Sequence, residues 1–185
     1  MALTRLPVAN TLTGTIPSGN IATSSLAAAD TGKVLQVVNQ FFDTQTSINA
    51  SAFTDTGLTA NITPASSSNK VLVSFYPSFS AVDNSYCAFK IFRDSTEIGS
   101  STVSGTGVEC FGGWLFSTSE QYSVYQSPMV FLDSPSSTSS LTYKLQVSPM
   151  RTTSHQFYLN RSHTQGDENQ FGGTSSNTVL MEIAG

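Results

Sequence analysis

The stretch from Lys70 to Gly99 alternates apolar and polar residues with a period of two, and this pattern constrains the fold more than any other feature. Successive side chains on a β-strand point to opposite faces of the sheet, so each half of the stretch presents one apolar stripe. We interpret the stretch as an antiparallel hairpin of two long strands with buried stripes, followed by a short return strand after Asp94–Thr96. The stripes are Val71, Val73, Phe75 and Phe79 before the polar turn at Asp83–Ser85, and Cys87, Phe89 and Ile91 after it.

The opposite face of the same stretch is too apolar to be left in water. It carries Leu72, Tyr86 and Phe92 beside polar residues. The segment from Val34 to Phe42 is apolar on both of its faces, which suits a strand between layers or between subunits. An exposed apolar surface of this kind indicates a partner subunit, although residue patterns do not select three copies over another cyclic number.

Alternating runs separated by turn clusters continue from Lys33 to the C-terminus. The runs are roughly nine or ten in number, and none has the period of a helix. We therefore predict an all-β domain at residues 33–185, an antiparallel two-sheet sandwich of jelly-roll type. The residues predicted to share a face are Leu58, Ala60 and Ile62; Leu141, Tyr143, Leu145 and Val147; Phe157 and Leu159; and Val179, Met181 and Ile183.

Residues 1–32 differ from the rest because they carry few large side chains and no sustained period. Such a segment buries too little surface to offset the conformational entropy lost on ordering. We predict an extended N-terminal arm that is anchored at intervals in a groove of another protein. The anchoring residues would be Leu3, Leu6, Val8, Leu12 and Ile16.

Composition argues against several classes of function. Only 11% of residues are charged and the net charge is −4, which disfavours nucleic-acid binding. A hydrophobic content of 38% favours a packed core over a disordered chain. The sequence contains no apolar run of about 18 residues and no signal-peptide core, so we expect neither membrane insertion nor general secretion.

No motif points to catalysis, a metal or a cofactor, and we expect a protein that is not an enzyme. Asp55, Asp94 and Asp133 stand next to Ser or Thr at strand ends, which is typical of turn residues. Cys87 and Cys110 form no metal motif, and we predict that they are not joined in a disulfide bond. A second group lacks the spacing of metal ligands and is interpreted as a solvated loop and its flank: His155, His163, Asp167 and Glu168.

The two longest stretches without strand pattern, Ser100–Gly113 and Ser162–Asn177, are the candidate sites of ligand recognition. Binding residues collect on long loops held by a rigid scaffold, and aromatic rings can stack on sugars. The residues that flank these loops are possible contacts for a receptor: Trp114, Tyr158, Asn160 and Arg161. The alternative is that the aromatic residues serve core or subunit packing, which is their commoner role.

The N-terminal phrase LPVANTLTGTIPSGN resembles a segment of tail-fibre proteins of tailed bacteriophages, which often contain "LPVANGGTG". Leu6–Asn10 match that phrase, and Thr11-Leu12 replace its Gly-Gly. The remainder is similar to small proteins of tailed, often marine, phages. The phrases that carry this similarity are GKVLQVVNQ, FTDTGLTANITPASSSNKVLV, FRDSTEIG, FLDSPSSTSSLTYKLQV, YLNRS and TVLMEIAG.

This resemblance implies a homotrimeric β-structured head on an arm that attaches to other virion proteins. The protein would be made in the host cytoplasm and would lie on the surface of the phage particle. The first functional class is a tail fibre or fibre tip that recognises bacterial surface glycan. The alternative is a head fibre, knob or capsid decoration protein with a purely structural role.

Overall fold

The computed structural model describes residues 32–50, 52–82, 84–117, 122–150, 156–164 and 173–185. The predicted arm residues Leu3, Leu6, Val8, Leu12 and Ile16 lie outside these ranges, as do His155, Asp167 and Glu168. The described residues contain thirteen strands and no helix, and all pairings between strands are antiparallel, which confirms the all-β prediction. The strands are β1 (Val34–Phe42), β2 (Thr46–Ile48), β3 (Thr54–Ile62), β4 (Lys70–Tyr76), β5 (Ser78–Ala81), β6 (Tyr86–Arg93), β7 (Thr96–Ile98), β8 (Gly112–Leu115), β9 (Tyr125–Gln126), β10 (Met129–Asp133), β11 (Leu141–Pro149), β12 (Phe157–Leu159) and β13 (Ser176–Ile183).

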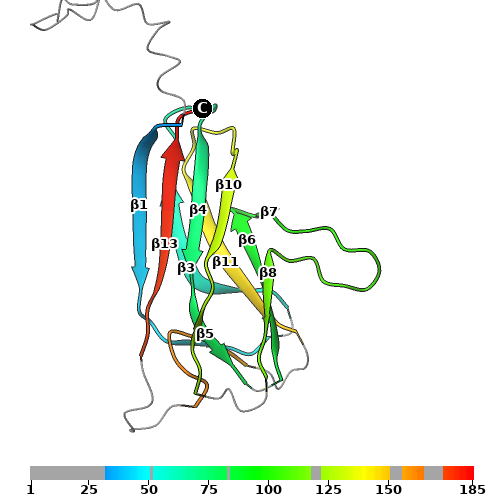
Figure 1. Ribbon diagram of the computed structural model, residues 1–185. Helices are drawn as coiled ribbons and strands as arrows, with labels where there is room; N and C mark the ends of the chain where they lie inside the picture. Colours follow the sequence, from blue (N-terminus) through cyan, green and yellow to red (C-terminus); the bar gives the residue numbers. More distant parts are fainter. Residues whose placement is uncertain (1–31, 51, 83, 118–121, 151–155, 165–172) are drawn as a thin grey trace, which may run out of the picture. The chain divides into compact units, whose positions relative to one another are not determined.

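The strands form three hydrogen-bonded sheets (Figure 1). The first sheet has the order β1-β13-β4-β10, and the second has the order β3-β11-β6-β7, with β8 also paired to β6. The third, short sheet has the order β2-β12-β5-β9. The two orders match position by position, because β2 follows β1 in sequence, β12 precedes β13, β5 follows β4 and β9 precedes β10. The short sheet therefore continues the first sheet beyond an interruption.

The interruption between the first and the short sheet has identifiable causes. Pro77 separates β4 from β5, and Pro128 separates β9 from β10. Proline lacks the backbone N–H that a sheet ladder needs, so a ladder cannot run through it. β10, which begins directly after Pro128, is an edge strand of the first sheet, a position where proline is tolerated.

At two positions in the sheets, the chain leaves the sheet as a loop after one strand and returns to the same position as the next strand. β7 and β8 pair with successive parts of β6, and the loop from Gly99 to Phe111 lies between them. β12 and β13 similarly continue one another beside β5 and β4. Counting each interrupted strand once, the described residues give four strand positions in each of two layers.

The core between the layers contains the predicted stripes. Val71, Val73, Phe75, Phe79, Cys87, Phe89 and Ile91 are at most 1% exposed. The inward faces predicted for β3, β11 and β12 are also buried. Aromatic rings occupy its centre, where the Phe79 centroid lies 5.1 Å from that of Phe89 and 5.7 Å from that of Phe157. Cys87 and Cys110 are both free cysteines, as predicted.

The predicted central hairpin is wrong in its pairing. β4 belongs to the first sheet and β6 to the second, so the turn near Ser85 carries the chain from one layer to the other. An alternating pattern identifies the buried face of a strand, but two strands that face each other across a core satisfy it as well as two paired strands. The return strand is confirmed, because β6 and β7 form a hairpin around Asp94, whose φ is 53°.

The last strand, β13, places its apolar and polar faces in an unexpected order. Val179, Met181 and Ile183 do share a face, but they are half-buried and point outward. The inward face of β13 is mostly polar: Ser176, Thr178, Leu180 and Glu182 are each at most 1% exposed. The outward orientation of the apolar residues is taken up below.

Glu182 is tolerated in the core because both of its carboxylate oxygens accept hydrogen bonds. Its oxygens accept bonds from Asn69 Nδ2 (2.5 Å), Gln36 Nε2 (2.6 Å) and the backbone N–H of Ala65 (2.7 Å). Burial alone would raise the pKa of Glu182, but the hydrogen bonds from Asn69, Gln36 and the backbone together lower it from its ordinary value of 4.5. The network ties β1 and β13 to the chain segment that precedes β4.

We expect the protein to lose stability in acid, because protonation of Glu182 removes the stabilising effect of its hydrogen-bond network. A lowered pKa in the folded state contributes stability that is complete above pH 4.5 and is lost as the pH falls through the folded-state pKa. Glu182→Gln should lower the free energy of unfolding at pH 7, and the gap between native and variant should narrow below pH 4.5. Urea denaturation of both proteins from pH 7 to pH 3 measures this, and a gap that is constant with pH would contradict it.

Candidate functional site

The outward side of the first sheet, hereafter the outer face, carries an apolar row that crosses all four strands. The cross-strand register aligns Val37 with Met181, Met181 with Leu72, and Leu72 with Leu132. Val37 and Leu132, at the two ends of the row, are 56% and 47% exposed. The prediction that Leu72 points away from the core is therefore confirmed, and it has apolar neighbours on both sides.

Two further rows extend the outer face. In the next row, Val179 and Val130 alternate with Asn39 and Ser74. In the third row, Phe41 and Tyr76 flank Asn177. Phe41 is 59% exposed, which is unusual for a large aromatic side chain on a regular strand. None of the residues in the three rows is charged.

The outward side of the second sheet has the opposite character. Two ion pairs lie on it, Lys90 Nζ with Glu97 Oε2 at 2.7 Å and Lys144 Nζ with Asp55 Oδ2 at 3.1 Å. Phe92 points outward as predicted but is half-buried, and Lys144 Nζ lies 5.9 Å from its ring centroid. The outward side of the second sheet thus carries two ion pairs, although Leu115 on β8 is also 60% exposed there, whereas the three rows of the outer face contain no charge.

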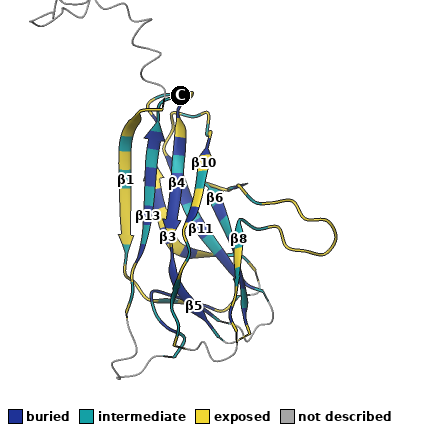
Figure 2. Cartoon of the chain, in the orientation of Figure 1, coloured by how far each residue is buried: buried dark blue, intermediate teal, exposed yellow. Residues whose placement is uncertain are grey.

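β1 adds an open strand edge to the outer face. It pairs only with β13 in the first sheet, and Figure 2 shows it exposed along most of its length. Its nine residues, VLQVVNQFF, include no charge and no proline. Natural sheets protect their edge strands with charged residues or proline, or cover them, because an open edge can pair with another strand. Val34 and Leu35, at the start of β1, are 47% and 43% exposed.

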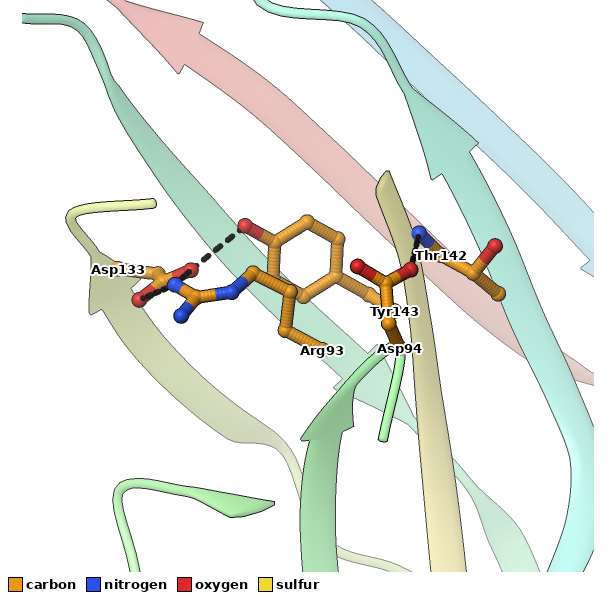
Figure 3. Close-up of polar contacts among 5 residues, drawn as sticks. All are labelled: Arg93, Asp94, Asp133, Thr142 and Tyr143. Atoms are coloured by element: carbon orange, nitrogen blue, oxygen red, sulfur yellow. Dashed lines mark hydrogen bonds and ion pairs between the residues drawn. The ribbon is translucent and has the colours of Figure 1, made fainter. Parts of the chain in front are cut away.

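Asp133, Arg93 and Tyr143 form the best-defined polar cluster (Figure 3). Arg93 Nη1 lies 2.8 and 2.6 Å from the two carboxylate oxygens of Asp133, and Tyr143 donates to Asp133 Oδ2 at 2.7 Å. Burial and the bond to Asp133 raise the pKa of Tyr143. For Arg93, burial lowers the pKa, but the bond to Asp133 and its charge raise it more.

This cluster joins the two layers and is not arranged for catalysis. Asp133 comes from β10 in the first sheet, and its partners come from β6 and β11 in the second. Its carboxylate is 7% exposed and both oxygens are bonded to side chains of the fold. The prediction that Asp133 is a turn residue is wrong. Asp94, which follows Arg93, does lie in the turn between β6 and β7, and its carboxylate accepts a bond from the backbone N–H of Thr142 in β11 at 2.9 Å (Figure 3).

The structure also bears on metal binding and ligand pockets. Within the described residues, no three His, Cys, Asp or Glu side chains are grouped as a metal site requires. A shallow hollow of about 290 Å³ opens on the outward side of the second sheet, at a bulge where Gly57 has a φ of 91°. Its lining includes Asp55 and Lys144, which already pair with each other.

The aromatic residues predicted as possible receptor contacts are largely covered by other side chains. Trp114 is half-buried, and its ring centroid lies 4.8 Å from that of Tyr125 and 6.3 Å from that of Phe79. Tyr158 is 6% exposed, and its ring is covered by Arg161 at 4.9 Å and stacked on His163 at 5.3 Å. Tyr158 therefore offers little surface to a receptor, and both aromatic residues pack against the fold, as in the alternative interpretation.

Asn160, another possible receptor contact, is fully buried and acts as a junction in the fold. Its Nδ2 donates to the carbonyl oxygens of Phe42 and Thr44, each at 3.0 Å, and its Oδ1 accepts from Ser176 Oγ at 2.6 Å. Its backbone has a φ of 60°, a conformation that asparagine adopts more readily than most residues. These contacts hold together the ends of β1, β12 and β13 where the first and short sheets meet.

Of the predicted recognition loops, the one between β7 and β8 is described throughout. It projects away from the sandwich in Figure 1, and Ser101–Glu109 are all exposed. Val103 and Val108 are 37% and 42% exposed, and Phe111 at its base packs on Phe131 with centroids 6.3 Å apart. Residues 165–172 of the other loop lie outside the described part.

Sequence reasoning identified Leu72 and Val34–Phe42 as outward apolar residues but missed Val130, Leu132 and Met181 as their neighbours. Register decides which residues meet across strands, and alternation within one strand does not contain it. The described part of the chain includes no helix long and apolar enough to span a membrane. Comparison with protein-family models and with curated proteins finds no match for this chain.

Proposed function

We propose that the chain is a non-enzymatic structural protein of a bacteriophage virion, a tail fibre or fibre tip that takes part in host-surface recognition. Residues 33–185 form a homotrimeric jelly-roll head, and residues 1–32 are the arm that attaches it to other virion proteins. The resemblance in sequence supplies the phage context. A head fibre, knob or capsid decoration protein is the alternative within the same structural class.

The single observation that carries the proposal is the strand order of the two layers. Counted as strand positions, one layer is β1/β2, β12/β13, β4/β5 and β9/β10, and the other is β3, β11, β6 and β7/β8. The chain crosses between layers at every connection except β6–β7. A jelly roll has eight strands in two sheets, and this architecture is common in viral capsid and lectin domains. The step from architecture to role is an analogy of fold.

The same geometry favours recognition through surface loops rather than a deep pocket. Trp114, Tyr158 and Asn160 are engaged within the fold, so they contribute little surface to a ligand. The projecting loop between β7 and β8 offers a long, exposed contact surface on a rigid base. A bacterial surface glycan or protein would be contacted there.

The experiment compares phage particles that carry the full chain with particles whose gene encodes only residues 33–185. We expect the full chain in purified particles by mass spectrometry, and we expect the truncated chain to be folded but absent from them. Immunogold labelling then distinguishes tail from head. Absence of the full chain from particles would refute the proposed function, and incorporation of the truncated chain would move the attachment surface onto the β-domain.

A further inference from the structure

The outer face is a large apolar surface that nothing in the described chain covers. Its first row alone places Val37, Met181, Leu72 and Leu132 side by side across four strands. With neighbouring strands about 4.8 Å apart and three rows about 7 Å apart, the rows cover roughly 400 Å² of sheet, which includes the polar residues Asn39, Ser74 and Asn177. Soluble monomers rarely expose apolar patches larger than a few hundred Å² without a function for them.

We propose that the outer face and the edge of β1 bind a second copy of this chain. The inference rests on the proposed function only for the number of copies, because a homotrimer needs a contact surface of this kind. It goes further by naming the surface. It also assigns the charged outward side of the second sheet to solvent.

Three features of the face fit an identical partner. A flat sheet face packs on another flat sheet face at a separation of about 10 Å. A face that meets its own copy brings identical side chains together near the symmetry axis, where a charge would repel itself, and its three rows contain no charge. The uncharged edge of β1 continues the face beyond Val37 and can pair with a strand of the neighbour.

The three rows supply part of the area that stable self-association needs. A standard interface buries about 800 Å² on each partner, and the rows supply roughly half of that as flat sheet. Side chains that stand above the sheet enlarge the contact, and Val34, 47% exposed, begins a further row that continues through Ile183 and ends at the charged Lys70. A closed ring, in which each copy touches two neighbours, enlarges it again.

The test uses the full chain and substitutions at the exposed ends of the apolar row. The native chain should be an oligomer by light scattering at micromolar concentration, and Val37→Glu combined with Leu132→Glu should reduce its mass to the 19.7 kDa of one chain. Both positions are half-exposed in the single chain, so the fold should survive, which circular dichroism checks. As a matched control, Thr59→Glu combined with Asn61→Glu, on the exposed side of β3, should leave the oligomer intact.

Each result either supports or overturns the proposal that the outer face binds a second copy. A native chain that is monomeric, or a folded double variant that remains oligomeric, would overturn the proposal. If the glutamate variant does not fold, Val37→Thr combined with Leu132→Thr replaces it and should weaken self-association at least tenfold. Self-association through this face by a chain that is missing from phage particles would refute the proposed function and leave the surface in place.

Discussion

Replacing Asp133 by alanine should lower the free energy of unfolding by about 3–5 kcal/mol, because it leaves Arg93 and Tyr143 without their shared partner. The lost contacts are two charge-assisted bonds from Arg93 at 2.8 and 2.6 Å and one bond from the buried Tyr143 hydroxyl. They link the two layers, so their loss also removes a connection across the core. Urea denaturation at one fixed protein concentration measures the change.

Two companion variants separate the ion pair from general loss of packing. Asp55→Ala removes an exposed partner of Lys144, and it should change stability by less than about 1 kcal/mol. Arg93→Met combined with Asp133→Leu removes both charges and should be less destabilising than Asp133→Ala alone, since no charge is left unpaired. If the free energy of unfolding of Asp133→Ala is within about 1 kcal/mol of the native value, the prediction is wrong, and water replaces Asp133 as the hydrogen-bond partner of Arg93.

The fold class and most of the core follow from the sequence because both depend on alternation within single strands. Phe75, Phe89 and Tyr143 could each be assigned to the interior from their own neighbours in sequence. Pairing could not be assigned in this way. The Lys70–Gly99 stretch contains the same alternation whether its halves share a sheet or face each other, and only the complete strand order distinguishes the two.

The polar interior was not predictable for a different reason. Glu182 and Asp133 look like surface or turn residues in the sequence, and each is buried only because several partners, distant in sequence, converge on it. Asn69 lies 113 positions before Glu182, and Arg93 lies 40 positions before Asp133. No local pattern encodes such a convergence, so local reasoning assigns these residues to solvent.

The candidate site contains both features that could be predicted from the sequence and features that could not. The apolar outward character of Leu72 and of Val34–Phe42 was evident from the residue pattern of each strand. A two-layer fold buries only one face of a strand, so a strand with two apolar faces leaves one of them outward. The burial of Tyr158 and Asn160 was not predictable, because aromatic and amide side chains serve interiors as readily as ligands. Tyr158 and Asn160 flank a long loop in sequence, yet both lie within the fold.

Asn160→Ala should destabilise the protein by about 3 kcal/mol or more. The substitution removes the acceptor for Ser176 Oγ and the donor to the carbonyl oxygens of Phe42 and Thr44. It also places alanine at a φ of 60°, which adds about 1–2 kcal/mol for a residue with a Cβ and no local hydrogen bond. Asn160→Gly tolerates this φ and should recover about 1 kcal/mol relative to Asn160→Ala, so the pair separates the backbone contribution from the side-chain bonds.

The same variants decide between a structural and a recognition role for this residue. If Asn160 is a junction between the first and short sheets, Asn160→Asp should also destabilise, because a carboxylate would face the carbonyl oxygens of Phe42 and Thr44. Asn61→Ala, at an exposed position of β3, is the matched control and should leave the midpoint of urea unfolding unchanged. A receptor contact would give the reverse result, with Asn160→Ala as stable as the native chain and defective only in adsorption of phage to host cells. Such a result would require Asn160 to leave its buried position, and its bonds to Phe42, Thr44 and Ser176 oppose that movement.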